Sequence, residues 1–189
     1  IKSKNLKFEI YFKIELITKA NLDLRLTTIA KKFKSKIIKE KFMLVFILNA
    51  GSSSLKYQLI NAKTSELKAS GLVERIGIDG ILKHEVGENK KLTFELPIPT
   101  HKEAIELVLR ILTNDETKVI NSITEIEAIG HRVVHGGEYF KKSTLITEDV
   151  IDKIKKLIPL APLHNPAHVI GMKICRELMP NVPNVATFD

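Results

Sequence analysis

Short apolar runs separated by small or polar residues fill residues 43–96, and this spacing predicts β-strands. Each run is short for a helix and is bounded by Gly, Asn or charged residues, which favour turns. The segments that we predict as strands are 44–48, 57–60, 67–76, 81–86 and 92–96.

The pattern changes at residue 100, after which apolar residues recur at three- and four-residue spacing. Thr100 and Glu103 have the spacing of a capping box, in which each residue satisfies an amide of the other, so we predict that a helix begins here. The apolar residues that follow form one helical face. Residues 126–134 (IEAIGHRVV) are then predicted as a buried strand.

Two further helices and a last strand are predicted in the C-terminal third. Thr147 precedes acidic residues, which favour the first turn of a helix because of the helix dipole. Asn165 and Pro166 suit the N-cap and first position of another helix that extends to about Leu178. Residues 182–189 have the character of a strand that ends in a carboxylate.

Leading strands followed by alternating helices and strands predict an α/β domain with a mixed β-sheet flanked by helices. A chain of 189 residues is long enough for one domain of ordinary size with a substantial core. Its single cysteine, Cys175, lies in a helical apolar pattern, so we expect a buried structural thiol. Because one cysteine gives no intrachain disulfide, the composition favours a cytoplasmic protein.

The positive charge of the chain is confined to its beginning. Residues 1–42 contain 12 Lys and Arg against 4 Asp and Glu, which accounts for the whole formal net charge of +8. The remaining residues carry 18 basic and 18 acidic side chains. A basic face of the kind that binds nucleic acid is therefore not expected in residues 43–189, and we predict no nucleic-acid partner.

We interpret residues 1–42 as a basic leader that is disordered, or as translated upstream sequence ahead of a natural start at Met43. A targeting or partner-binding arm is the alternative. The segment lacks the uninterrupted apolar core of a secretory signal, and it is richer in acids and poorer in Arg than a transit peptide. The chain contains no run of about 18 apolar residues that could span a bilayer, so we predict no membrane partner.

Residues 49–56, with the sequence NAGSSSLK, join two predicted strands through small residues. Small turn residues let backbone amides approach an anion closely, and alternation along the second strand would bring Ser52, Ser54 and Lys56 to one face. We therefore predict a cradle for nucleotide phosphates. The segment is not a Walker A loop, because it lacks GxxxxGK[ST] and a strand follows it. A simple hairpin turn with an exposed lysine is the alternative.

Three other clusters carry residues suited to chemistry: 129–137 (IGHRVVHGG), 159–167 (PLAPLHNPA) and 182–189 (VPNVATFD). Together with the first turn, the segments NAGSSSLKYQL, GHRVVHGG, APLHNPA and ATFD resemble the acetate kinase family, and they stand in its expected order. The resemblance extends almost continuously over residues 43–189, which would be the N-terminal lobe of such an enzyme. Propionate kinase is a close relative, and the sequence distinguishes it from acetate kinase only weakly.

The resemblance implies a ribonuclease-H-like lobe, shared by acetate and sugar kinases, heat-shock chaperones and actin, with the second lobe absent from this chain. It also implies reversible transfer of the ATP γ-phosphoryl to acetate with Mg²⁺, giving acetyl phosphate and ADP, in a homodimeric enzyme. The family's transition-state His and Arg, its adenosine-binding loops and its Mg²⁺-binding Glu would all follow residue 189, so this fragment alone is expected to be inactive.

The resemblance assigns the phosphate and metal contacts to the first turn. Lys56, Ser52 and Ser54 would bind ATP phosphates, and Asn49 would contribute to the Mg²⁺ site. These assignments agree with the cradle predicted from the residues themselves.

The resemblance assigns the acetate site to the later clusters. Arg132 would bind substrate, since its planar fork can hold a carboxylate or phosphoryl group bidentately; a structural ion pair at a strand end is the alternative. Val134 and Leu163 would line an apolar pocket for the methyl group. Asp189 matches the catalytic Asp, and we interpret its role as organising Mg²⁺ and water rather than transferring a proton, because acetate is already ionised at pH 7.

The six histidines do not show the spacing of a zinc site. We expect hydrogen-bonded supporting roles for His131, His135 and His164, and ordinary surface or packing roles for the other three, His84, His101 and His168. Two other classes of function stay open: a non-catalytic nucleotide-binding lobe of the actin and chaperone type, and an interaction protein that acts through its basic leader.

Overall fold

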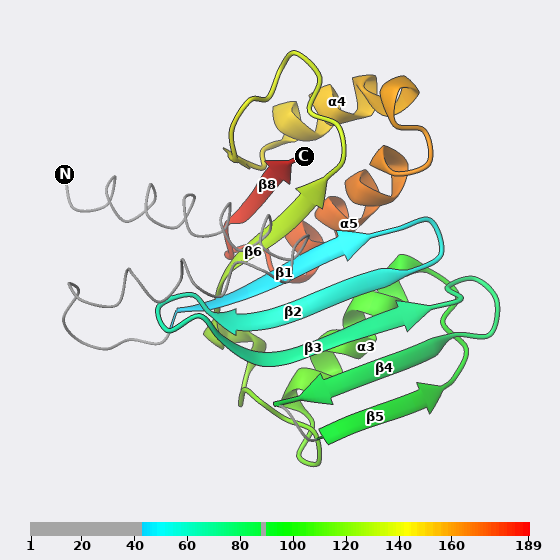
Figure 1. The fold of residues 1–189 in the computed structure, drawn as a ribbon, viewed down its shortest axis with the longest axis vertical. Helices are drawn as coiled ribbons and strands as arrows, with labels where there is room; N and C mark the ends of the chain where they lie inside the picture. Colours follow the sequence, from blue (N-terminus) through cyan, green and yellow to red (C-terminus); the bar gives the residue numbers. More distant parts are fainter. Residues whose placement is uncertain (1–42, 88–89) are drawn as a thin grey trace.

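The computed structural model describes residues 43–87 and 90–189, so our interpretation of residues 1–42 lies outside the described part. One eight-stranded sheet organises this part, with the strand order β5-β4-β3-β2-β1-β6-β8-β7 (Figure 1). The strands are β1 Leu44–Ala50, β2 Leu55–Asn61, β3 Glu66–Glu74, β4 Ile81–Val86, β5 Lys90–Glu95, β6 Ile126–Val133, β7 Thr144–Leu145 and β8 Asn184–Phe188. The helices are α3 His101–Thr113, α4 Glu148–Lys156 and α5 Asn165–Leu178, with short 3-10 turns η1 Ile123–Glu125 and η2 Ile158–Leu160.

The sheet is mixed, as predicted. Strands β1 to β5 form an antiparallel meander, whereas β1 pairs parallel with β6 and β6 pairs parallel with β8. Two parallel strands need a long connection between them, and helices form part of each connection here. Along the chain, α3 lies between β1 and β6, and α4 and α5 lie between β6 and β8. The short β7 pairs antiparallel with β8 at the edge, and the sequence pattern did not indicate it.

All three helices pack against the same face of the sheet, where α3 lies behind β3 and β4 and α5 lies behind β1 and β6 (Figure 1). Alternation along β1 sends Phe46 and Leu48 into the core on the helix side. Val45 and Ile47 belong to a separate apolar cluster on the opposite face. The same alternation places Asn49 on that opposite face, which decides where the site lies.

The start of α3 differs from the predicted capping box. Thr100 is the N-cap, but its hydroxyl oxygen accepts from the amide of Lys102, and the Thr100 hydroxyl itself donates to the Glu103 carboxylate. The Thr100 oxygen therefore accepts from the second helical residue, whereas the capping box requires the third. The capping box of the described residues forms instead at Ser122 and Glu125, where the sequence analysis did not place an element.

The start of α5 is shifted by one residue from the prediction. His164 is the N-cap, so that Asn165 and Pro166 occupy the first two helical positions. The Asn165 side chain is fully buried and donates to the carbonyls of His135 and Leu157, at 3.2 and 3.4 Å. Because its amide is used in these long-range contacts, Asn165 anchors the helix to the loop after β6 and does not cap it.

Two histidines that we expected to be ordinary surface or packing residues are buried and hydrogen-bonded. His84 on β4 is fully buried, and its Nδ1 lies 2.5 Å from the Tyr57 hydroxyl. His101, the first residue of α3, is 9% exposed and contacts the turn after β1. The buried thiol of Cys175 is as predicted, and burial raises its pKa above the ordinary value.

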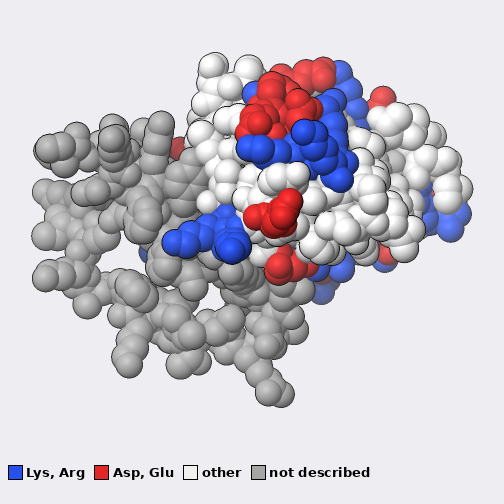
Figure 2. Space-filling model, turned by 90° about the horizontal axis from the view of Figure 1, so that it is seen from above, with Lys and Arg blue, Asp and Glu red and all other residues white. Residues whose placement is uncertain are grey.

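The surface of the described residues mixes both signs of charge. Basic and acidic side chains adjoin one another on the face seen in Figure 2. None of the helices formed by residues 43–87 and 90–189 has the length and apolar character needed to cross a bilayer.

Candidate functional site

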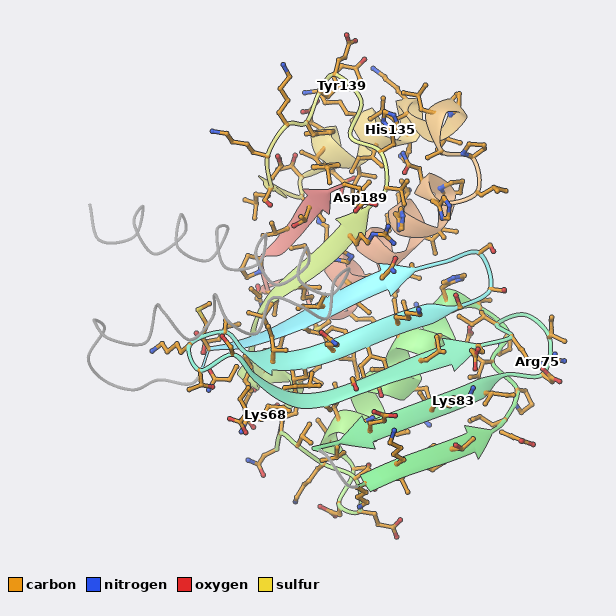
Figure 3. All side chains as sticks on the ribbon, in the orientation of Figure 1. Lys68, Arg75, Lys83, His135, Tyr139 and Asp189 are labelled. Carbon is orange, nitrogen blue, oxygen red and sulfur yellow. The ribbon has the colours of Figure 1, made fainter. Side chains whose placement is uncertain are left out.

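The site forms where the carboxyl ends of β1, β6 and β8 meet. These strands are mutually parallel, so their last residues lie at one edge of the sheet, which is where open α/β sheets bind ligands. Asn49 stands near the end of β1, Arg132 near the end of β6 and Asp189 directly after β8. Figure 3 shows Asp189 beside the end of β6. Three clusters that are far apart in sequence are thus brought together.

Arg132 and Asp189 form a bidentate ion pair. The Arg132 Nε donates to one carboxylate oxygen at 3.0 Å and a terminal nitrogen donates to the other at 2.6 Å. Their side chains are 27% and 30% exposed, so the pair is open to solvent. The ion pair that we considered as the alternative for Arg132 therefore exists, and its partner is the residue that the resemblance assigns to catalysis.

A depression of about 490 Å³ opens on the sheet face that carries Asn49, opposite the helices. Arg132, Asn49 and Lys56 all line it, together with residues of β2, β3 and β4. Asn49 and Lys56 are direct cross-strand neighbours, and neighbours of this kind share a face of the sheet. No carboxylate among the described residues forms an ion pair with Lys56, so its ammonium is available to an anion.

The turn between β1 and β2 is held by backbone bonds. The Gly51 amide donates to the Ser54 carbonyl at 2.7 Å, and the Ile76 amide donates to the Ser53 carbonyl at 3.0 Å. Because β2 begins only at Leu55, Ser52 and Ser54 lie in the turn and the strand alternation that we expected to align them with Lys56 does not reach them. Any contribution from these two residues would come from turn geometry.

The apolar pocket expected at Val134 and Leu163 is not enclosed by the described residues. Leu163 lies in the turn before α5 and is 76% exposed, and Val134 is partly exposed just after β6. A side chain exposed to this degree cannot by itself form the wall of a methyl-sized pocket. Val134 follows Arg132 closely in the chain, but another surface would have to cover both residues to complete a pocket.

Two histidines near this edge of the sheet are hydrogen-bonded, of which His131 is buried and His135 is exposed. His131 is 3% exposed, and its Nε2 lies 2.8 Å from the Asn184 side-chain oxygen. Burial lowers the pKa of His131 to about 4, against the smaller opposing effect of the Asn184 hydrogen bond. His135 is also hydrogen-bonded, because its Nδ1 accepts from the Gly137 amide at 2.9 Å. The predicted supporting role is thus consistent with the contacts of both residues.

His168 was missed by the sequence analysis. It is 2% exposed, and burial, together with the positive charge of nearby Arg132, lowers its pKa to about 4. Its ring stacks on that of His164 one turn earlier, with centroids 6.4 Å apart. The His164 ring therefore supports His168 by stacking, and not through the side-chain hydrogen bond that we expected for it. The four-residue spacing in HNPAH at a helix start was the signal that could have paired them.

A mixed sheet with helices on one face, a small-residue turn after its first strand and charged residues at the ends of its parallel strands define a ribonuclease-H-like lobe. Comparison with known proteins agrees with this class. Residues 44–189 match the acetokinase family, and the chain belongs to that family.

Curated relatives carry the same family name. The chain is 56% identical over 148 residues to an acetate kinase of Agathobacter rectalis, and 56% identical over 144 residues to an acetate kinase of Clostridium acetobutylicum. These alignments cover 78% and 76% of this chain but only 37% and 36% of the relatives. The chain thus spans little more than a third of the length of the curated relatives that it matches.

Solved structures give the same result. An acetate kinase from Porphyromonas gingivalis superposes with a TM-score of 0.76 at 42% identity, and a propionate kinase from Francisella tularensis with a TM-score of 0.70 at 40% identity. In each case 78% of this chain and 37% of the solved chain are covered. One lobe of these kinases is therefore the part that the described residues represent.

Proposed function

We propose that this chain is part of an acetate kinase, which transfers the γ-phosphoryl group of ATP to acetate and forms acetyl phosphate and ADP reversibly. The observation that carries the proposal is the position of Arg132, held beside Asp189 at the ends of two parallel strands and next to the depression that Asn49 and Lys56 line. The 56% identity to curated acetate kinases supports it.

Arg132 suits the substrate anions. Acetate is ionised at pH 7, so no base is required, and the task of the site is to hold two anions in line and offset their repulsion. One acetate oxygen attacks the γ-phosphorus while the bond to the β-phosphate oxygen breaks, and ADP leaves with that electron pair. A guanidinium fork already satisfied by a carboxylate in this structure can exchange Asp189 for the carboxylate of acetate or an oxygen pair of the phosphoryl group.

Lys56 and the turn after β1 would bind the phosphate chain of ATP. The Lys56 ammonium has no ion-pair partner among the described residues, and it lies on the same face as Asn49. A point charge of this kind, combined with backbone amides of a small-residue turn, is a common way to hold phosphates. Ser52 and Ser54 would add hydroxyl donors from the turn.

The donor set suits Mg²⁺. Asn49 offers an amide oxygen and Asp189 a carboxylate, and Mg²⁺ is usually held by one or two carboxylates together with substrate phosphates and water. The described residues hold no group of three acidic, His or Cys side chains that could bind a metal alone. The ion would neutralise phosphate charge in the transferring group, and Asn49 and Asp189 would orient it and its waters.

Propionate kinase is a second candidate, favoured by the likeness to the Francisella tularensis enzyme. Acetate and propionate differ by one CH₂, for which burial contributes only about 0.8 kcal/mol, so pocket size has to discriminate between them. On the resemblance to the family, Val134 and Leu163 would line that pocket once another surface covers them. We further propose a homodimeric, cytoplasmic enzyme, on the resemblance to the family.

A chimaera tests the proposal directly. Residues 44–189 would replace the matching segment, 37% of the length, of the Agathobacter rectalis acetate kinase, which supplies the rest of the enzyme. We expect acetyl phosphate formation, measured as the hydroxamate, with a kcat in the range of about 1–100 per second that is usual for kinases. The 189-residue chain alone gives the baseline, and we expect no turnover from it.

The choice of acceptor is read from the same protein. Acetate should give a higher kcat/KM than propionate, and a reversed order would favour the second candidate. A folded chimaera without activity on either acid, beside an active parent enzyme, would contradict the proposed function. The matched control is the parent enzyme with its own segment re-inserted by the same junctions.

A further inference from the structure

The hairpin turn after β1 is closed by one hydrogen bond instead of two. Gly51 and Ser54 face each other across two intervening residues, and the Gly51 amide donates to the Ser54 carbonyl at 2.7 Å. In a tight two-residue hairpin the reverse bond, from the Ser54 amide to the Gly51 carbonyl, is also expected. Among residues 43–87 and 90–189 no partner is found for the Ser54 amide, so the second bond is not formed.

The Gly51 carbonyl has a different partner. The Nε2 of His101 lies 2.7 Å from this oxygen, 50 residues away in sequence. Since a carbonyl only accepts, His101 must carry a proton on Nε2 and donate it. His101 is the first residue of α3 and is 9% exposed, so the contact is fixed by the packing of the helix against the sheet.

Two further carbonyls of the turn are held by backbone donors. Ile76 donates to the Ser53 carbonyl at 3.0 Å, and Ser54 accepts from Gly51. A Cβ on Gly51 would lie 2.8 Å from the Ser54 hydroxyl oxygen, so the Ser54 side chain would have to rotate if Gly51 were replaced by a larger residue. The turn therefore holds the carbonyls of Gly51, Ser53 and Ser54 on fixed donors. It leaves the amides of Ser52, Ser53 and Ser54 without acceptors among the described residues.

We propose that His101 is a positioning residue for phosphate binding: by drawing the Gly51 carbonyl toward α3 it turns this oxygen away from the Ser54 amide, which stays free to donate to a phosphate oxygen. The inference rests on the proposed function, because it deepens the role of the turn as the site for the ATP phosphate chain. His101 does not contact the ligand. It acts through Gly51, so the packing of α3 against the sheet sets the shape of the turn after β1.

Backbone amide exchange tests the first step without any ligand. In the wild-type chain the Ser54 amide should exchange faster than the hydrogen-bonded amides of the neighbouring strands β1 and β2. His101→Leu removes the donor and frees the Gly51 carbonyl, so the Ser54 amide should bond to this oxygen. Its exchange rate should then fall by a factor of about ten. His101→Gln keeps an N–H donor at similar reach and should retain the wild-type rate.

Inorganic tripolyphosphate tests the consequence, because it has the charge and spacing of the ATP phosphate chain without the nucleoside. Titrated into the ¹⁵N-labelled 189-residue chain, it should shift the resonances of Ser52–Ser54 saturably. We expect His101→Leu to weaken this binding about tenfold, as loss of one hydrogen bond to a charged group would, and His101→Gln to stay within about threefold.

His84→Leu is the matched control, because His84 is also buried and hydrogen-bonded but contacts Tyr57 and not the turn. It should lower thermal stability and leave both the Ser54 exchange rate and tripolyphosphate affinity unchanged. Unchanged exchange or unchanged affinity in His101→Leu, or equal losses in His101→Leu and His101→Gln, would overturn the inference. A wild-type chain that exchanges as expected but does not bind tripolyphosphate would instead overturn the assignment of phosphate to this turn.

Discussion

Arg132 is the residue on which the proposed chemistry depends most. In this structure its fork is occupied by Asp189, through two hydrogen bonds of 3.0 and 2.6 Å. An exposed pair of this kind contributes little to stability, so it can open at small cost when an anion competes for the fork. We interpret the pair as the resting arrangement of two functional groups.

Replacing Arg132 by Lys in the active chimaera tests this interpretation. The charge remains but the bidentate fork is lost, and kcat/KM for acetate should fall about 10²-fold, equivalent to about 2.7 kcal/mol of transition-state stabilisation. ATP affinity, measured by calorimetry, should change little, because Lys56 and the turn carry it. Arg110→Lys, on the exposed side of α3, is the matched control. A kcat/KM for acetate near that of the control would mean that Arg132 only stabilises the strand end.

His168 makes a prediction about pH. Its pKa is lowered from the ordinary 6.5 to about 4 by burial first and by Arg132 second. The unfolded chain therefore binds more protons between these two values, so stability is fully present above pH 6.5 and is lost as pH falls toward 4.

His168→Leu removes this dependence. Between pH 7 and pH 5 the wild-type protein should lose about 2 kcal/mol of unfolding free energy relative to the variant, as followed by urea unfolding at each pH. His131 has the same lowered pKa, so a residual slope should remain in His168→Leu. Parallel stability curves for the two proteins would show that His168 is not neutral and buried in the way that the structure indicates.

At the scale of elements, α4 offers a test of local sequence signals. Thr147 caps the helix, and its side-chain oxygen accepts from the Val150 amide at 3.3 Å. Thr147→Ala should lower the unfolding free energy by about 1 kcal/mol, because a helix amide loses its acceptor. Thr147→Ser keeps the hydroxyl and should stay close to the wild type. Chemical denaturation of the three proteins side by side is the measurement, and equal losses in both variants would assign the effect to the lost methyl group.

The elements also show which local signals were reliable. The Thr147 cap was predicted correctly because its acceptor and donor lie within one helical turn. At Thr100 the predicted helix start was correct, but the hydroxyl oxygen accepts from the Lys102 amide and not from the Glu103 amide that a capping box uses. At Asn165 the prediction failed because long-range contacts to two carbonyls hold the side chain inside the protein.

At the scale of the whole molecule, the sheet and helices of residues 43–87 and 90–189 pack around apolar clusters on both faces of the sheet. We predict that a chain starting at Met43 folds as well as the 189-residue chain, with a melting temperature within about 2 °C of it. It should also lose salt-dependent binding to heparin, because the removed segment carries the entire net charge of +8. Circular dichroism melting and a heparin column test both expectations. A drop of several degrees would show that the leader packs on the domain.

The sequence by itself determined the secondary structure pattern, the mixed α/β sheet and the family, because these depend on local periodicity and on contiguous motifs. It also selected Arg132 and Asp189, which stand in such motifs. Their direct pairing depended on the parallel alignment of β6 and β8, which no local spacing expresses. The tertiary structure alone decided the contact of His101 with Gly51 and the burial of His168, since each joins a helix to a strand end far away in the chain.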